Sequence, residues 1–216
     1  MKDFYNYLPN TSQYYNSDGT IILHPARILI IGSSGSGKTN CLLNIINSMN
    51  CFTKYYIYAK MKGCDKLYDD ILIPHIQKTE SEHNLEILEA YESNLENLPL
   101  VADLDDVEQK IFIFDDLINS SSKDLNNIQD YFIMSRKKNC SLVFISQNYY
   151  SIPKVIRNNI TTVCITKVDS SRDLRLIAND ICCDDYDEVR EHYNSRKDVF
   201  IKTIDGKGKT RYITDF

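Results

Sequence analysis

The chain has 216 residues, which is enough for one globular domain with a buried core. Hydrophobic residues make up 43% of it and charged residues 25%, and no apolar run approaches the roughly 20 residues that span a membrane, so we expect a soluble protein that requires no membrane. The formal net charge of -5 argues against a protein that coats nucleic acid with its whole surface, but it leaves room for a local basic patch.

The N-terminal stretch, residues 1–19, shows neither a helical nor a strand period and carries no visible export signal. We expect it to be an arm that is disordered or contacts a neighbouring subunit, followed by a single domain over residues 20–216. The seven cysteines have no CxxC spacing and no nearby histidine at a metal-ligand interval. They are typical of reduced intracellular thiols.

A glycine-rich loop follows the first predicted strand, 28–31, and precedes an amphipathic helix. Its spacing is that of the phosphate-binding loop G-x-x-x-x-G-K-[ST], in which backbone N–H groups face the β-phosphate of a nucleotide. Lys38 would neutralise the β and γ oxygens, and Thr39 would bind Mg²⁺. The residues predicted to bind the nucleotide are Gly32, Ser33, Ser34, Gly35, Ser36, Gly37, Lys38 and Thr39.

A pair of carboxylates ends the buried strand predicted at 111–114, in "KIFIFDDL". Asp115 is predicted to hold the magnesium ion through its water shell, and Asp116 to polarise the attacking water as a general base. The alternative is a pair of acids that serves the start of the next helix. Because the phosphate loop is also present, we favour a catalytic pair on a strand adjoining that loop.

Three further polar residues flank the strand predicted at 142–146. Gln147 follows it, and we expect it beside the Asp115 strand, where it senses the γ-phosphate or orients water. Arg136 precedes the strand and Arg157 comes after it. A guanidinium stabilises the charge that a transferred phosphoryl group spreads, although for either arginine alone an ordinary solvated position is the better interpretation.

The remaining elements complete an alternation of strands and helices. Further strands are predicted at 54–58, 162–166 and 199–204, and helical faces at 42–49, 125–132 and 174–181. Nearly continuous apolar strands suit a sheet covered on both faces, so the expected fold is a three-layer α/β domain with a mostly parallel sheet and ligands at the carboxyl ends of its strands. The stretch "VFIKTIDGKGKTRYIT" predicts a C-terminal antiparallel hairpin.

The order of these signals resembles the poxvirus-type genome-packaging ATPases of the FtsK/HerA superfamily, found in large DNA viruses, virophages and Polinton-like elements. The resemblance runs from about Pro25 to the C-terminal hairpin. It rests on "HPARILIIGSSGSGKT", "KYYIYAK" with "DKLYDD", "IFIFDD", "SRKKNCSLVFISQNYYSIPKVIRNN" and "TTVCITKVDSSRDLRLI". It implies a RecA/FtsK-like P-loop NTPase that uses ATP and Mg²⁺ to move double-stranded DNA into a preformed capsid.

The resemblance also implies a homo-oligomeric ring, a pentamer or hexamer, with each ATP site between subunits. A capsid or portal vertex protein would be the other partner, in the host cytoplasm or viral factory or in association with the virion. Lys38 and Thr39 match the family's Walker A motif, Asp115 and Asp116 its Walker B motif, and Gln147 its sensor. Arg136 falls where an arginine acting on the neighbour's γ-phosphate is expected, with Arg157 second.

One departure concerns the Walker B motif, because many relatives carry Asp-Glu where this chain carries two aspartates. Asp116 is therefore shorter than the family's usual base. Candidate DNA contacts are the "SRKKN" run at 135–139, Lys123, and "DGKGKTR" near the end. Each of them is more often an ordinary solvated surface.

Two other classes of protein share the phosphate loop. A small GTPase-like switch is suggested by "TKVD" at 166–169, which imitates the guanine-reading N-K-x-D motif with threonine in place of asparagine. A nucleoside kinase shares the size and the α/β order, but it usually needs a lid with several arginines, and the arginines here do not cluster in that way. The motor remains the favoured interpretation.

Overall fold

The computed structural model describes residues 22, 24–168, 170–182, 186–195, 200–204 and 210–213. Within them, one sheet has the strand order β3-β2-β4-β5-β1-β6-β7-β8. The strands from β3 to β6 in this order are parallel, whereas β7 is antiparallel to both β6 and β8. The strands are β1 (Arg27–Ile31), β2 (Lys54–Ala59), β3 (Leu88–Glu92), β4 (Lys110–Asp115), β5 (Cys140–Ser146), β6 (Thr162–Ile165), β7 (Phe200–Ile204) and β8 (Thr210–Ile213).

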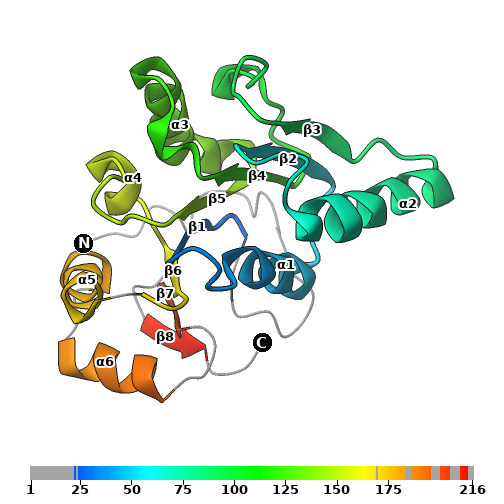
Figure 1. Ribbon diagram of the computed structural model, residues 1–216. Coiled ribbons are helices and arrows are strands. Elements are labelled where there is room, and N and C mark those ends of the chain that lie inside the picture. Colours follow the sequence, from blue (N-terminus) through cyan, green and yellow to red (C-terminus); the bar gives the residue numbers. More distant parts are fainter. Residues whose placement is uncertain are drawn as a thin grey trace, which may run out of the picture.

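Helices cover both faces of the sheet, so the domain has three layers. Helices α1 and α2 lie on one face, and α3 and α4 lie on the other (Figure 1). The α-helices are α1 (Lys38–Met49), α2 (Ile73–His83), α3 (Ser122–Met134), α4 (Lys154–Asn158), α5 (Ser171–Ile177) and α6 (Tyr186–Asn194). Short 3-10 helices occupy η3 (Val101–Asp103), η4 (Leu117–Asn119) and η5 (Ser135–Lys138), and π-helices occupy η2 (Tyr68–Leu72) and η6 (Ala178–Cys182).

The central strands are apolar along most of their length because they contribute to two cores. In β4, Ile111 and Ile113 join the core under α1 and α2, while Phe112 and Phe114 join the core on the other face. Successive side chains of a strand point to opposite faces, so a strand covered on both faces needs apolar residues at every position. The predicted three-layer fold with a mostly parallel sheet is therefore confirmed.

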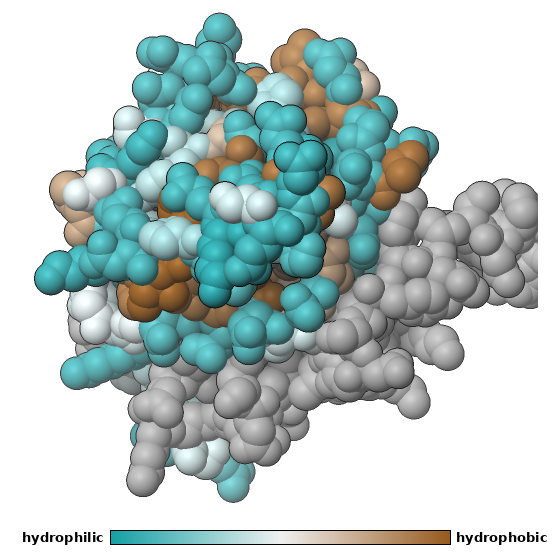
Figure 2. Space-filling model, turned by 90° about the vertical axis from the view of Figure 1, so that its right-hand side faces the viewer, coloured by the Kyte–Doolittle hydropathy of each residue, from teal (hydrophilic) through white to brown (hydrophobic). Residues whose placement is uncertain are grey.

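Helices α2, α4 and α6 and edge strand β3 lie where no helix or strand was expected. Helix α2 carries only two buried side chains, Ile73 and Ile76, and edge strand β3 is only half-buried. An edge strand and a helix with a narrow apolar face give weak periodic signals. Beside them the surface on the α1 and α2 side is mainly hydrophilic, with hydrophobic side chains in separate patches (Figure 2).

Some predictions fall outside the described residues. They are the arm at 1–19, the turn of the C-terminal hairpin at 205–209, and Asp169. Among the described residues, no helix combines the length and the hydropathy needed to cross a membrane.

Candidate nucleotide-binding site

The strand register brings the predicted site residues to one edge of the sheet. Ile31 of β1 pairs with Ser146 of β5, and Asp115 of β4 pairs with Ile145 of the same strand. The residues that follow these strands, among them Gly32, Asp116 and Gln147, therefore start from one row at the carboxyl edge. Here one expectation is wrong: the Asp115 strand does not adjoin the strand of the phosphate loop, because β5 lies between them.

The phosphate loop depends on glycines for two different reasons. Gly35 and Gly37 have left-handed backbones, with φ of 70° and 87°, which favour glycine. Gly32 instead lacks room, since a Cβ there would lie 1.9 Å from Thr166 Oγ1. The loop continues into α1 at Lys38. Its path thus requires glycine at Gly35 and Gly37 because of their backbone conformation, and at Gly32 because of close packing.

The end of β6 supports this loop. Ser33 N donates to Lys167 O at 2.9 Å, and the hydroxyls of Ser36 and Thr166 lie 2.6 Å apart. Tyr193 of α6 holds the same segment by donating to Thr166 O at 3.2 Å and accepting from Val168 N at 3.1 Å. The first residues of "TKVD" thus serve the phosphate loop, which gives them a structural explanation independent of guanine binding.

Lys38 spans the loop from the start of α1. Its Nζ donates to Ser33 O at 2.8 Å. Burial lowers the pKa of Lys38, and the negative charges of Asp115 and Asp116 act in the opposite direction. The ammonium group is therefore close enough to the carboxylate pair to feel both charges, as a shared triphosphate site requires.

The carboxylate pair is under electrostatic and conformational strain. Burial raises the pKa of Asp115 to about 6, with further upward contributions from the charges of Asp116 and Asp65. Asp116 has a left-handed backbone with φ of 54°, although aspartate tolerates this region better than most residues. Strained backbone and perturbed carboxylates both concentrate at functional sites.

Asp65 and Tyr68, for which the sequence predicted no role, also lie at this edge. Thr39 Oγ1 donates to Asp65 Oδ2 at 2.9 Å, and Tyr68 OH donates to Asp115 Oδ2 at 2.9 Å. Both come from the stretch "DKLYDD" after β2, which helped to carry the family resemblance but suggested no chemistry. A loop aspartate and a tyrosine form no motif, so only the three-dimensional contacts reveal them.

The set of donors fits a hydrated magnesium ion. Thr39 supplies a hydroxyl and Asp115 a carboxylate, and oxygen ligands are those that Mg²⁺ prefers. The charges of Asp116 and Asp65 both act on Asp115, and that of Lys38 opposes them, so a divalent cation would reduce the repulsion among these carboxylates. No group of three acidic, histidine or cysteine side chains in the described part of the chain is arranged to hold a metal by itself.

Gln147 lies beside a pocket next to the phosphate loop. The pocket has a volume of roughly 310 Å³ and is lined by residues from the loop, the end of β5 and α5, including Ser33, Gln147, Tyr150 and Asp173. Gln147 is exposed there. Gln147 is thus at the predicted edge, directly after β5, the strand next to that of Asp115.

The two arginine candidates occupy different environments. Arg136 is exposed in η5, at the amino edge of the sheet, and its charge acts on Arg27 at the start of β1. Arg157 lies over the ring of Tyr149 and forms an ion pair with Asp180, which also accepts from Tyr149 OH at 2.8 Å. Arg136 therefore projects from the edge opposite its own phosphate loop, and Arg157 is engaged within its own chain.

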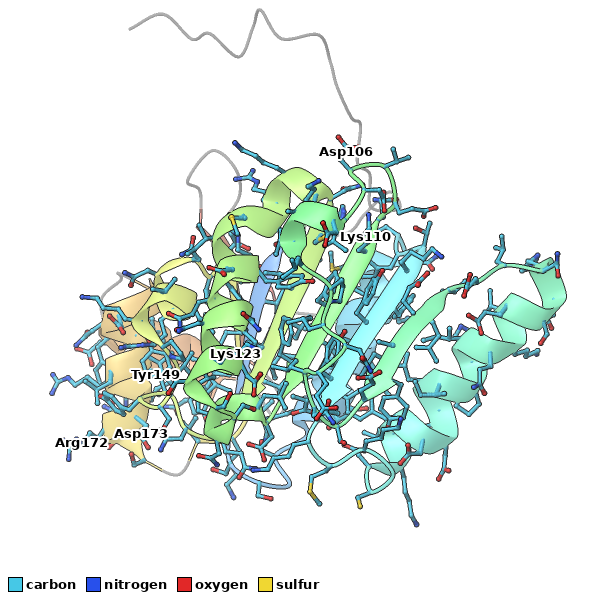
Figure 3. All side chains as sticks on the ribbon, turned by 90° about the horizontal axis from the view of Figure 1, so that it is seen from above. Asp106, Lys110, Lys123, Tyr149, Arg172 and Asp173 are labelled. Atoms are coloured by element: carbon cyan, nitrogen blue, oxygen red, sulfur yellow. The ribbon has the colours of Figure 1, made fainter. Side chains whose placement is uncertain are left out.

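The candidate DNA contacts also separate between the two edges. In the "SRKKN" run, Arg136 and Lys137 are exposed, whereas Lys138 Nζ donates to Leu104 O at 2.6 Å. Lys123 is exposed near the start of α3. In Figure 3 the amino edge of the sheet is marked by Lys110 and Asp106, and the carboxyl edge by Tyr149 and Asp173. The "DGKGKTR" run lies largely outside the described residues.

Together the parallel sheet, the glycine loop at the start of α1 and the aspartate pair at the end of β4 define the P-loop NTPase fold. The sequence profile of the poxvirus A32 protein family matches residues 15–203. The chain belongs to this family, which confirms the poxvirus-type resemblance seen in the motifs.

Curated relatives include the DNA packaging protein OPG160 of variola virus and that of vaccinia virus strain Copenhagen. Each is 30% identical to this chain over 151 residues, which cover 68% of this chain and 55% of the relative. The monkeypox virus protein of the same name is also 30% identical, with 49% of its length covered. The chain thus spans about half the length of the curated relatives it matches.

Solved structures with a similar fold include the genome packaging NTPase B204 of Sulfolobus turreted icosahedral virus 2. Its complex with AMPPCP has a TM-score of 0.57 and 11% identity, and the match covers 88% of this chain and 97% of that one. Its complex with ATP-gammaS gives a TM-score of 0.51 with 11% identity over 89% of this chain and 98% of that one. This likeness shows the fold, which is shared over nearly the whole chain.

Proposed function

We propose that this chain is an ATP-hydrolysing motor domain that moves double-stranded DNA into a preformed viral capsid. The observation that carries the proposal is the strand register, which brings the phosphate loop, Asp115 with Asp116, and Gln147 to one edge. Membership of the A32 family adds to it, since relatives in that family are named DNA packaging proteins.

The residues at this edge would divide the chemistry among them. Lys38 and the N–H groups of the loop bind the phosphates, and Thr39 with Asp115 holds the hydrated Mg²⁺. When bound, the metal neutralises charge on the β- and γ-phosphates. Asp116 accepts a proton from the attacking water, and Gln147 orients that water or contacts the γ-phosphate.

The structure weakens the argument for a GTPase-like switch. Thr166 and Lys167, the first half of the guanine-like motif, make their contacts with the phosphate loop. A strong preference for GTP over ATP in steady-state hydrolysis would nevertheless contradict the motor. Stimulation by small phosphate acceptors in place of DNA would favour the kinase.

We further propose a homo-oligomeric ring, a pentamer or hexamer, in which Arg136 acts on the nucleotide of the next subunit. Arg136 starts from the edge of the sheet opposite its own phosphate loop, so its own nucleotide is out of reach. Arg157 is the weaker candidate, because its ion pair with Asp180 would have to break first. A capsid or portal vertex protein would anchor the ring, in the host cytoplasm, a viral factory or the virion.

The test is ATP hydrolysis by the purified chain with and without linear duplex DNA. We expect phosphate release to rise when duplex is added and to fall as salt is raised, since phosphate contacts release counterions. An activity that no duplex changes would contradict the motor.

A mixing experiment tests the ring. Arg136→Ala subunits are titrated into wild type, with Lys78→Ala, an exposed lysine of α2, as the matched control. Because a subunit that lacks Arg136 also disables its neighbour, we expect activity to fall faster than the wild-type fraction. A fall in simple proportion would contradict action across the interface.

A further inference from the structure

The segment between β2 and α2 enters the nucleotide site as a third element, beside the phosphate loop and the end of β4. We call residues 60–70 the DKLYDD segment, after the sequence of its second half. From it, Asp65 contacts Thr39 and Tyr68 contacts Asp115. One short segment thus contacts both protein residues that are proposed to hold the magnesium ion.

Asp65 is itself fixed by its own backbone surroundings. Its Oδ1 accepts from Leu67 N at 2.9 Å, and its carbonyl accepts from Tyr68 N at 3.1 Å and Asp69 N at 3.0 Å. One carboxylate oxygen is therefore committed to the local turn, and the other, Oδ2, accepts from Thr39. An acceptor held in this way can determine the orientation of the threonine hydroxyl.

Tyr68 is equally well fixed. Its side chain is only 1% exposed and packs in the core under α1 and α2. Its hydroxyl donates to Asp115 Oδ2 at 2.9 Å. Tyr68 therefore holds one oxygen of Asp115 and leaves the other for further ligands.

We propose that Asp65 and Tyr68 are positioning residues for the magnesium ion, an inference that rests on the proposed function. A hydroxyl has one proton and two lone pairs. When Asp65 accepts the proton of Thr39, a lone pair of the hydroxyl is available to the metal. Tyr68 sets the orientation of Asp115 in the same way that outer-shell hydrogen bonds orient metal ligands elsewhere.

Asp65 is a positioning residue and not a ligand in this proposal. Its two oxygens already accept hydrogen bonds from Leu67 N and Thr39. Thr39 and Asp115 would be the protein groups that hold the metal, and Asp65 would act on it only through Thr39. Removal of Asp65 should therefore weaken the use of the metal more than the binding of the nucleotide itself.

The experiment measures binding of a fluorescent ATP analogue to the full chain as Mg²⁺ is titrated, and again in EDTA. Asp65→Ala removes the acceptor and Asp65→Asn restores a neutral one, while Tyr68→Phe keeps the ring but removes the hydroxyl. Asp70→Ala, an exposed carboxylate of the same segment, is the matched control. Thermal melting of each variant without nucleotide checks that the fold is intact.

We expect Asp65→Ala and Tyr68→Phe to raise the Mg²⁺ concentration at half-saturation by about 10–100-fold. Asp65→Asn should recover most of the loss, and Asp70→Ala should behave as wild type. Affinity in EDTA should not change in any of them. Wild-type Mg²⁺ dependence in both variants, or an equal loss with and without Mg²⁺, would overturn the positioning role. Failure of the wild-type chain to bind the analogue would instead overturn the proposed function.

Discussion

The two edges of the parallel sheet differ in how their buried charged side chains are paired. At the amino edge Lys110 is only 1% exposed, yet its Nζ is paired with Asp105 Oδ2 at 2.8 Å and also donates to Glu108 O at 2.9 Å. His24 has both ring nitrogens in hydrogen bonds of 2.7 Å, to Ser141 and Asn139. Both of these buried polar side chains have local partners.

At the carboxyl edge the charges are not balanced locally. The charges of Asp65 and Asp116 act on Asp115, burial disfavours the charge on Asp115, and Asp116 adopts a left-handed backbone. Uncompensated charge and strain cost stability. A fold keeps such an arrangement where a ligand supplies the missing charges, so the comparison supports the proposal that the chemistry takes place at the carboxyl edge.

The largest expected effect comes from Asp116→Asn. Asparagine tolerates the left-handed backbone and keeps the size of the side chain, but it cannot accept a proton from water. We expect kcat for ATP to fall by about 10²–10⁴-fold with the affinity for a non-hydrolysable analogue unchanged. Steady-state hydrolysis and equilibrium binding measure the two quantities. Full hydrolysis in this variant would place the base elsewhere.

The pH dependence of the free energy of unfolding should also differ between the two edges. Asp115 at the carboxyl edge and His24 at the amino edge change this free energy in opposite directions as pH rises. Asp115 has a folded pKa of about 6, above its usual 3.8, so the folded chain binds more protons and its free energy of unfolding falls as pH rises from about 4 to 6. Burial lowers the pKa of His24 from 6.5 to about 4, so the unfolded chain binds more protons and stability is lost as pH falls from about 6.5 to 4.

Asp115→Asn separates these contributions. It should raise the free energy of unfolding by about 3 kcal/mol at pH 7 and by almost nothing at pH 4. Urea unfolding at four pH values between 4 and 7 provides the measurement. His24→Gln is the control from the other edge, and it should remove the loss of stability towards pH 4. A constant difference between Asp115→Asn and wild type across this range would contradict the burial of a charge at the site.

Gly32→Ala should have a smaller effect on stability. The new Cβ would lie 1.9 Å from Thr166 Oγ1, and overpacking of this kind costs about 1–3 kcal/mol. Adding Thr166→Ala removes the nearest atom and should recover part of the loss, although Ser36 Oγ would still lie 2.8 Å away and Lys167 O 3.0 Å away. Urea unfolding of both variants tests this. Gly63→Ala, with φ of 79° and open space, should cost only about 1–2 kcal/mol.

Much of the carboxyl edge was predictable from the sequence because its signals are local. The phosphate loop needs particular residues at fixed spacing, and Asp115 with Asp116 stands out at the end of a wholly apolar strand. The alternation of strands and helices then places them at one edge. The layered fold followed from the same apolar runs, since Phe112 and Ile113 must both be buried.

What could not be predicted depends on pairing between distant segments. Nothing in the sequence shows that β5 lies between β1 and β4, because strand order is set by tertiary packing. The contacts of Asp65 with Thr39 and of Tyr68 with Asp115 join residues 26 and 47 positions apart. Edge strand β3 was missed for another reason, since partial burial relaxes the demand for apolar residues.

The most direct test compares one lysine from each edge, by calorimetric binding of a Mg²⁺-bound, non-hydrolysable ATP analogue. Lys38→Met should lose affinity by about 100-fold or more, because it removes a charge-assisted contact with phosphate, and thermal melting checks that it folds. Lys110→Met should lose about 1–3 kcal/mol of stability, since two carbonyls and Asp105 lose their donor, while its folded molecules bind as wild type. Wild-type affinity in Lys38→Met would contradict the assignment of chemistry to the carboxyl edge.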